Sequence, residues 1–200
     1  MSRLTSPLRL GDRTAPACLL FGPHVTNLGR ERGLTARHAA YYGRRAQGGA
    51  GIVVTETASV HASDWPYERA PLASSSGPGW AEIAAAVGDA GALAMASLGH
   101  AGGQGSSAYS QAALWAPSPM PMNNDREVPK VMEPADIEAV VAGFADATAR
   151  ARASDMDGVE VNAGQFSLVR QFLSGLTNQR GDAYGEDRGR LLREVLDACR

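Results

Sequence analysis

Four apolar runs divide the chain, and each of them ends at polar or glycine residues. They lie at residues 17–22, 51–55, 92–96 and 157–161. Short runs of nearly continuous hydrophobicity are typical of strands that are buried on both faces of a parallel sheet. We therefore expect parallel strands near residues 17–22, 51–56, 92–98 and 158–162.

The segments that follow these runs carry apolar residues at helical spacing. Thr35 is placed to cap one helix and Pro134 to begin another. The spacing predicts helices near 35–47, 80–90, 134–154 and 187–199. Their apolar positions are Ala39, Tyr42 and Ala46; Trp80, Ile83, Ala84 and Val87; Ile137, Val140, Val141, Phe144 and Ala147; and Leu191, Leu192, Val195, Leu196 and Cys199. A strand–helix alternation repeated in this way predicts an α/β fold with a parallel sheet and right-handed crossovers.

Composition narrows the class of protein. The chain has 200 residues, 44% of them hydrophobic and 20% charged, which is enough for one sizeable core with no internal boundary. A formal net charge of −2 offers no basic surface for nucleic acid or an anionic membrane. The two cysteines, Cys18 in the first predicted strand and Cys199 in the last helix, imply no disulfide framework. Neither an apolar signal core nor a run of transmembrane length occurs, so we expect a cytoplasmic protein.

Two carboxamides follow the fourth run directly. Asn162 and Gln165 lie three residues apart at the predicted carboxyl end of that strand. In parallel α/β proteins the catalytic groups lie at this end of the strands, which makes the pair a candidate site. The alternative is that both side chains cap the next turn or helix.

The four histidines do not form a metal-binding motif. His24, His38, His61 and His100 show no ligand spacing such as His-x₃-His. We expect His38, within a predicted helix, to have a surface or packing role. His100 follows the third strand in a glycine-rich loop and has the best claim to a place in a pocket. Because the segment 101–132 is too long for a simple connection, it is expected to line a site or an interface.

Several motifs resemble those of the old yellow enzyme family, in the same order along nearly the whole chain. The sequence Asp-Gly-Val-Glu-Val at 157–161, with the segment 171–185, is similar to the family's fourth βα unit. Leu-Gly-His-Ala-Gly at 98–102 is similar to its third-strand motif, and Gly-Pro-His-Val-Thr at 22–26 resembles its first flavin loop. Arg-Ala-Gln-Gly-Gly at 45–49 resembles the approach to its second strand.

The finer pattern around Asn162 and Arg180 looks closer to one part of that family. The sequences Asn-Ala-Gly-Gln at 162–165 and Thr-Asn-Gln-Arg at 177–180 resemble the dienoyl-CoA reductase-like and mycofactocin-associated branches of these NADH:flavin oxidoreductases.

The resemblance implies a fold, a cofactor and a reaction. It implies a TIM (β/α)₈ barrel that binds FMN, takes hydride from NAD(P)H and passes it to an activated alkene or a related small molecule. A complete barrel has eight units and about 250 residues. Residues 1–200 would therefore form the N-terminal half of one FMN-binding barrel. The phosphate site is typically built after strands seven and eight, so it would lie in the other half.

Five residues take flavin-binding roles by the same resemblance. Pro23, His24 and Val25 fall where the main chain meets the flavin ring, and Thr57 falls near the ring's polar edge. Ser97 occupies a position usually held by a glutamine that binds the pyrimidine portion. A serine is too short for that bond, so a bridging water or a shifted ring would have to compensate.

The positions nearest to the substrate depart from the family pattern. Asn162 and Gln165 replace a His/His or His/Asn pair that stabilises the developing enolate of the substrate. Amides can donate hydrogen bonds but carry no positive charge. Ser167 lies where many members have a tyrosine proton donor, and an alkyl hydroxyl is a much poorer acid. Another acid would then be needed, for which His100 and Tyr109 are the candidates.

Two functions of different class remain open on the sequence. The first is an FMN oxidoreductase that acts on a small molecule once the barrel is complete. The second is a non-catalytic half-barrel that forms a homo-oligomer, or binds a partner that supplies the second half, through its exposed strand edges. The serines at 97 and 167 favour the second function, and the intact flavin loop favours the first. We expect Arg180 and Asp182 to be structural in either case, ordering their loop by charge-assisted hydrogen bonds.

Overall fold

The structure, a computed structural model, describes residues 3–122 and 127–200, and its elements alternate between strand and helix. Short β-strands and α-helices follow one another along the chain, with two 3₁₀ turns at Arg3–Thr5 and Gly102–Gln104. The elements are β1 (Leu8–Leu10), β2 (Arg13–Ala15), β3 (Leu20–Phe21), α1 (Ala36–Gln47), β4 (Ile52–Val54), β5 (Ala58–Ser59), α2 (Ala73–Gly88), β6 (Leu93–Gly99), α3 (Ser107–Ser110), β7 (Trp115–Ala116), β8 (Lys130–Val131), α4 (Pro134–Ala153), β9 (Gly158–Val161), α5 (Leu168–Leu173), α6 (Ala183–Glu186) and α7 (Arg190–Ala198).

The central sheet is parallel, and its strands follow the order of the chain. Strand β4 pairs with β3 and with β6, and β9 pairs with the far side of β6. The short β5 also pairs with β6, near the end of that strand, and so continues the line of β4. The predicted parallel α/β fold is therefore confirmed, and all four expected strands are present.

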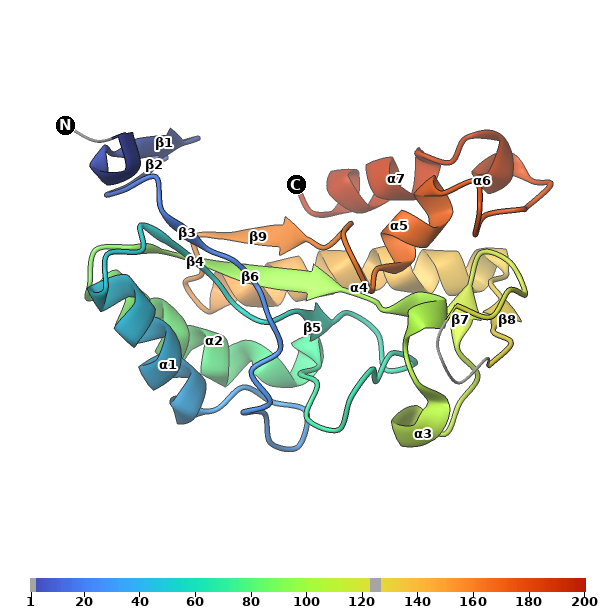
Figure 1. Cartoon of the computed structure of the whole chain (residues 1–200), viewed down its shortest axis with the longest axis horizontal. Helices are drawn as coiled ribbons and strands as arrows, with labels where there is room; N and C mark the ends of the chain where they lie inside the picture. Colours follow the sequence, from blue (N-terminus) through green and yellow to red (C-terminus); the bar gives the residue numbers. More distant parts are fainter. Residues whose placement is uncertain (1–2, 123–126) are drawn as a thin grey trace.

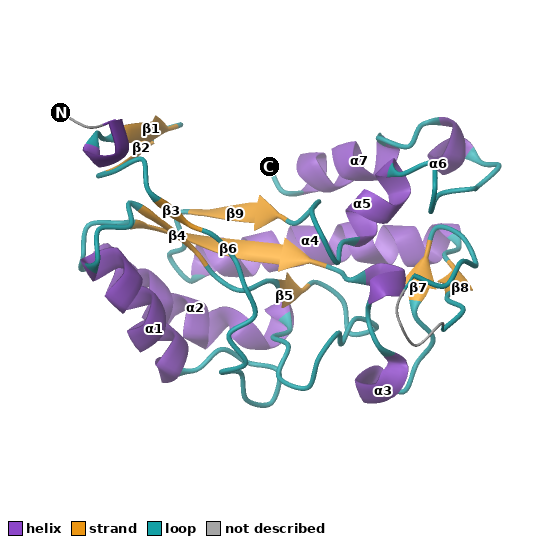
Figure 2. Cartoon of the chain, viewed as in Figure 1, coloured by secondary structure: helices purple, strands orange, loops and turns teal. Residues whose placement is uncertain are grey.

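Helices cover one face of this sheet. Figures 1 and 2 show α1, α2 and α4 side by side along that face, and α7 packs against α4. The fully buried side chains at this interface include Tyr42, Trp80, Ile83 and Phe144. No helix among the described residues is both long and apolar enough to cross a membrane.

The opposite face of the sheet carries a second, smaller apolar cluster. Ile52, Val54 and Leu93 point to this side, because side chains alternate along a strand. Ala15 and Leu8 pack on them from the antiparallel β1–β2 hairpin. In Figure 1 this hairpin lies at the end of the sheet from which the strand arrows point away. The hairpin thus covers the amino ends of the strands, whereas it leaves their carboxyl ends open.

The prediction that the first strand is buried on both faces was wrong. Only Leu20 and Phe21 have strand geometry, and Leu19 and Leu20 are 45% and 56% exposed. Strand β3 pairs with one neighbour only, so one of its edges and much of its apolar surface stay uncovered among the described residues. Cys18 lies outside the strand and is exposed.

The prediction for the second helix placed its start too late. Helix α2 begins at Ala73 and contains Pro78, whereas the spacing predicted a start near residue 80. Two buried residues ahead of the proline, Ala73 and Ser76, extend the face that Trp80 and Ile83 continue. Tertiary packing of this face overrides the local signal of the proline and its neighbouring glycines.

A substitution at Gly51 tests the close contact between the segment before β3 and the start of β4. A Cβ at this position would collide with the main chain of Ala17, lying 2.7 Å from its nitrogen. We expect Gly51→Ala to lower the free energy of unfolding by about 1–3 kcal/mol, as other overpacked sites do. Urea denaturation measures this change. Gly88→Ala is the matched control, because nothing lies within 4 Å of a Cβ there; equal stability of the two variants would contradict the contact.

Candidate active site

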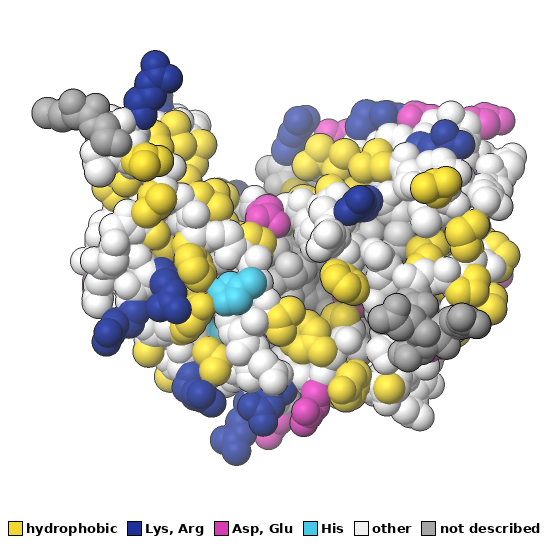
Figure 3. Space-filling view, viewed as in Figure 1, with side chains coloured by type: hydrophobic (Ala, Val, Ile, Leu, Met, Phe, Trp, Pro, Cys, Tyr) yellow, Lys and Arg dark blue, Asp and Glu magenta, His cyan; other side chains and the backbone are white. Residues whose placement is uncertain are grey.

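A cavity of about 640 Å³ opens at the carboxyl ends of the central strands. Its volume falls within the range of about 300–1,000 Å³ that is usual for small-molecule sites. Figure 3 shows a hollow in the middle of this face, with most charged side chains at the periphery. Residues from the loops after β3, β4, β5, β6 and β9 line it: Pro23, His24, Val25, Thr57, Ser59, Asp64, Pro66, Tyr67, Gly99, His100, Ala101, Gln104, Asn162, Gln165 and Phe166.

The first wall of the cavity is the irregular segment after β3. Pro23, His24 and Val25 line it, and Val25 is 60% exposed. Within the described part of the chain, the main-chain N–H groups of His24 and Val25 donate to no other residue. The His24 ring is held from behind by a 2.9 Å hydrogen bond to the Tyr41 hydroxyl. This wall therefore contains main-chain donors that no described residue uses.

A buried carboxylate that was not singled out from the sequence fixes this wall. Glu56 is 1% exposed and precedes Thr57 at the end of the β4 segment. Thr26 donates to it twice, from its main-chain N–H (3.0 Å) and from its hydroxyl (2.5 Å). His38 Nε2 lies 2.6 Å from the same carboxylate, and the Tyr67 hydroxyl donates to it at 3.0 Å.

The hydrogen bonds decide the charge of Glu56. Burial raises the pKa of its carboxyl, but donation from His38, Thr26 and Tyr67 outweighs burial, so the pKa lies below the ordinary value. Burial and the nearby carboxylate also raise the pKa of Tyr67, which keeps this phenol protonated. Glu56 is thus an anion that joins helix α1 to two loops of the cavity.

His38 has a different role from the one that we expected. It is fully buried and paired with Glu56, and it is not a solvated or simple packing residue. The sequence does contain a signal for this burial, since His38, Tyr42 and Ala46 recur at four-residue spacing and so share the buried face of α1. Thr35 caps this helix as predicted.

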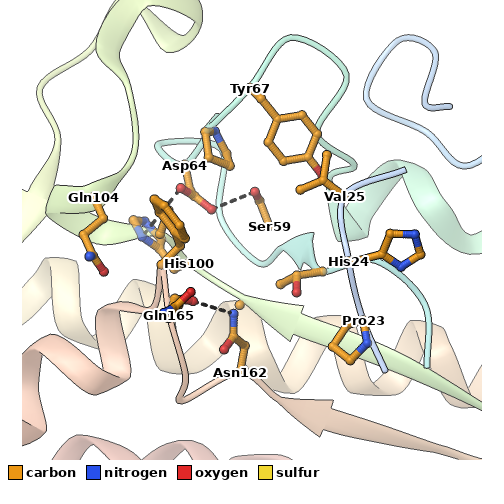
Figure 4. A pocket seen from close by; sticks show the side chains of 15 residues that line it. Pro23, His24, Val25, Ser59, Asp64, Tyr67, His100, Gln104, Asn162 and Gln165 are labelled. Atoms are coloured by element: carbon orange, nitrogen blue, oxygen red, sulfur yellow. Dashed lines mark hydrogen bonds and ion pairs between the residues drawn. The ribbon is translucent and has the colours of Figure 1, made fainter. Parts of the chain in front are cut away.

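The amide pair lies on the opposite wall, in the loop after β9. Asn162 and Gln165 both line the cavity, and Asn162 Nδ2 lies 3.5 Å from the main-chain oxygen of Gln165 (Figure 4). Asn162 Oδ1 accepts from the N–H of Gly164 at 2.9 Å, so both ends of this amide contact the 162–165 turn. Ser167 is fully buried, caps α5 and donates to the main-chain oxygen of Asn162 at 2.6 Å. Its hydroxyl is engaged in ordering the loop and does not line the cavity.

Ser97 lies beneath the cavity. It is fully buried, and its hydroxyl lies 2.9 Å from that of Thr57 and donates to Glu160 at 3.2 Å. Thr57 lines the cavity and Ser97 does not, so Ser97 contacts the cavity wall only through Thr57. Its direct contact with a cofactor stays a prediction.

The two candidate proton donors differ in position. His100 is 3% exposed and lines the cavity, whereas Tyr109 is 42% exposed, packs near Trp65 and does not line the cavity. His100 Nε2 bonds to the Ser63 hydroxyl at 3.0 Å, and that hydroxyl bonds to His61 Nδ1 at 2.9 Å. Since His61 is only partly buried, a hydrogen-bonded path leads from the cavity wall toward the surface.

Arg180 has the structural position that the sequence suggested. Its guanidinium bonds to Asp182 and donates to the main-chain oxygen of Met132 at 2.7 Å. It therefore joins the loop before α6 to the segment before α4 and does not line the main cavity.

The fold is a parallel α/β arrangement with a cavity at the carboxyl ends of its strands. The sequence model of the NADH:flavin oxidoreductase / NADH oxidase family matches residues 3–200, so the chain belongs to this family. The predicted family membership is therefore confirmed.

Named relatives agree with this membership. The chain is 34% identical over 188 residues to a metal reductase of Desulforamulus reducens, covering 94% of this chain and 28% of that protein. It is 28% identical to an NADPH dehydrogenase of Bacillus subtilis, covering 98% of this chain and 59% of the relative. The chain thus spans between about a quarter and three fifths of these relatives.

Solved structures show the same fold. A complex of 2-naphthoyl-CoA reductase with 2-naphthoyl-CoA superposes with a TM-score of 0.92 at 26% identity, covering 99% of this chain and 33% of that one. The old yellow enzyme homologue of Zymomonas mobilis gives a TM-score of 0.88 at 28% identity, covering 99% and 59%. The expected barrel family is confirmed by these superpositions.

Glu56→Gln tests the buried anchor. The amide would place N–H groups against the donors Thr26, His38 and Tyr67, so we expect a loss of about 3–5 kcal/mol in unfolding free energy at neutral pH. The pKa of Glu56 in the folded protein is lowered from the ordinary value of 4.5. Its contribution to the free energy of unfolding is therefore complete above pH 4.5 and is lost as the pH falls through the lowered pKa. Urea melts across pH should therefore show the difference from the parent shrinking in acid.

The exposed Glu82 on α2 provides the control for that experiment. Glu82→Gln should leave the melting curve unchanged at every pH. A Glu56→Gln protein as stable as the parent at neutral pH would show that the carboxylate is not the anchor.

Proposed function

We propose that this chain forms the flavin-facing and substrate-facing part of an FMN-dependent NAD(P)H oxidoreductase. The substrate is an activated alkene or a related small molecule with a conjugated carbonyl. The remaining strands of the barrel complete the site and supply its phosphate-binding loops. The observation that carries the proposal is that one 640 Å³ cavity joins the unused main-chain donors after β3 to the amide pair after β9.

The residues present suit a flavin. Pro23, His24 and Val25 offer a rigid main-chain wall, and Thr57 offers a hydroxyl at the floor of the cavity. Gly99 keeps this floor open, because a Cβ there would lie 2.8 Å from the Thr57 methyl group and 3.3 Å from Asn162. When bound, FMN supplies the hydride that it has received from NAD(P)H.

The amide pair orients the substrate. Asn162 and Gln165 donate neutral hydrogen bonds to the carbonyl oxygen, and these bonds strengthen as negative charge develops there. Neutral amides stabilise such an oxyanion less than an imidazolium does, but they do so at any pH because they do not titrate.

The side chains considered as proton donors do not present a free proton to the cavity. Ser167 is held in the cap of α5, and Tyr109 does not line the cavity. Both ring nitrogens of His100 are engaged, Nδ1 by the N–H of Gly102 and Nε2 by the Ser63 hydroxyl. We therefore assign the final protonation to solvent or to a group from the remaining strands of the barrel.

A non-catalytic half-barrel is the second candidate. The exposed Leu19 and Leu20 and the open edges of β3 and β9 favour association with another copy or with a partner. Association alone, however, gives no reason for the donor-lined cavity. Oxidation of NADH or NADPH in the presence of FMN separates the two candidates.

Alanine variants of the amide pair test the proposal in the completed barrel. We expect Asn162→Ala or Gln165→Ala to lower kcat/KM for the alkene by up to about 10²–10³-fold, the effect of one lost oxyanion donor. FMN affinity and NAD(P)H oxidation should stay close to the parent values, because the flavin wall is elsewhere. Steady-state kinetics that follow the two half-reactions separately measure this.

Gln47→Ala, an exposed change at the end of α1, controls for general damage. If both amide variants reduce the alkene at the rate of the parent and of the control while FMN stays bound, the assigned role of the pair is wrong.

A further inference from the structure

Among the described residues that line the cavity, one carries a carboxylate, and it is distinct from the Glu56 anchor. Asp64 belongs to the loop after β5 and is 4% exposed, yet it contributes to the cavity wall. Figure 4 shows it beside Ser59 and His100, across the view from Asn162. Its main-chain N–H closes the turn that starts at His61.

The groups around this carboxylate do not neutralise it. Ser59 donates to Asp64 Oδ2 at 2.7 Å, and His100 Nδ1 lies 4.0 Å from Oδ1. That nitrogen already accepts the N–H of Gly102 at 2.9 Å, so it carries no proton. Burial also lowers the pKa of His100, which keeps the ring neutral. The imidazole is therefore a dipole beside Asp64 and not a cation.

The Arg32 guanidinium lies near Asp64 but forms no hydrogen bond with its carboxylate. Arg32 Nη2 donates to the main-chain oxygen of Asp64 at 2.6 Å, and its guanidinium lies over the Trp65 ring. Within the described part of the chain, the Asp64 carboxylate forms no ion pair with a lysine or arginine. A buried carboxylate without a cation is unfavourable, and such charges are normally paired or lie where a ligand supplies the partner.

We infer that Asp64 binds a protonated amine of the substrate, so that this oxidoreductase acts on amine-bearing carbonyl compounds. The inference rests on the proposed function and names its substrate class. The amine would meet Asp64 and Ser59 on one wall, and the carbonyl would meet Asn162 and Gln165 on the other.

The rest of the lining suits the carbon skeleton between these two groups. Pro66, Tyr67 and Phe166 provide apolar and aromatic surface in the same cavity. An aromatic ring such as that of Tyr67 also favours a nearby ammonium group. The cavity thus combines an anion, an aromatic wall and neutral amide donors, which no neutral hydrocarbon substrate would use.

A pair of probes of equal shape tests the site in the 200-residue chain. Benzylamine is protonated at neutral pH, and benzyl alcohol is its neutral counterpart. Titrations followed by tryptophan fluorescence should show benzylamine binding at least tenfold more tightly, because Trp65 and Trp115 lie next to the Asp64–His100 wall. Asp64→Asn should abolish this preference.

A matched control keeps the experiment specific. Asp146→Asn removes an exposed carboxylate on α4, far along the chain from the cavity, and should keep the full preference.

Thermal melts distinguish a ligand-binding carboxylate from a structural one. If Asp64 is held unpaired for a ligand, Asp64→Asn should leave Tm unchanged or raise it. A lower Tm for Asp64→Asn together with an unchanged amine preference would overturn the inference. Equal binding of the two probes by the parent chain, or binding of neither, would overturn it as well.

These outcomes are separate from the proposed function. A completed protein that oxidises NAD(P)H with FMN, but shows no preference for the amine, would keep the oxidoreductase assignment and lose the Asp64 site. A protein that prefers the amine but shows no flavin-dependent activity would keep the Asp64 site and lose the oxidoreductase assignment.

Discussion

The buried pair of Glu56 and His38 is the interaction on which the site depends. The Glu56 carboxylate receives hydrogen bonds from Thr26, His38 and Tyr67, and so joins the loop after β3, helix α1 and the loop after β5 at one point. The two loops have little regular structure where they meet the cavity. A buried anion that accepts several hydrogen bonds holds the segments that donate them more firmly than apolar contacts alone would. Any movement of a segment would leave a buried donor without its acceptor, which is unfavourable. The Glu56 carboxylate therefore fixes the shape of the cavity wall after β3 from its buried side.

The polar groups of the cavity differ in charge from one wall to another. Neutral amides lie after β9, free main-chain donors lie after β3, and a carboxylate lies after β5. The relatives bear names as different as metal reductase and NADPH dehydrogenase, and in barrels the strand-end loops commonly carry such differences in chemistry. In this chain Asn162, Gln165 and Asp64 contribute polar side chains to the cavity from such loops.

The order of strands and helices could be predicted from the sequence because the buried face of each element fixes the spacing of its apolar residues. The runs around Val53, Ala94 and Val159 became parallel neighbours, and the amide pair appeared at a strand end as expected. Prediction failed where a distant partner decides the outcome. The exposure of Leu20 follows from the missing neighbour of β3, and α2 runs through Pro78 because its first turn is packed. The role of Glu56 depends on hydrogen bonds from Thr26 and His38, which lie far from it in the sequence, and no local pattern contains them.

The central claim is that this chain presents a flavin site between the loops after β3 and β9. Amide NMR spectra of the ¹⁵N-labelled chain, titrated with FMN, test it most directly. The account predicts that shifts concentrate at His24, Val25, Thr57, His100 and Asn162, with the signals of the β1–β2 hairpin and of α7 unchanged. Shifts confined to other surfaces, or a spectrum that FMN leaves unchanged at millimolar concentration, would contradict it.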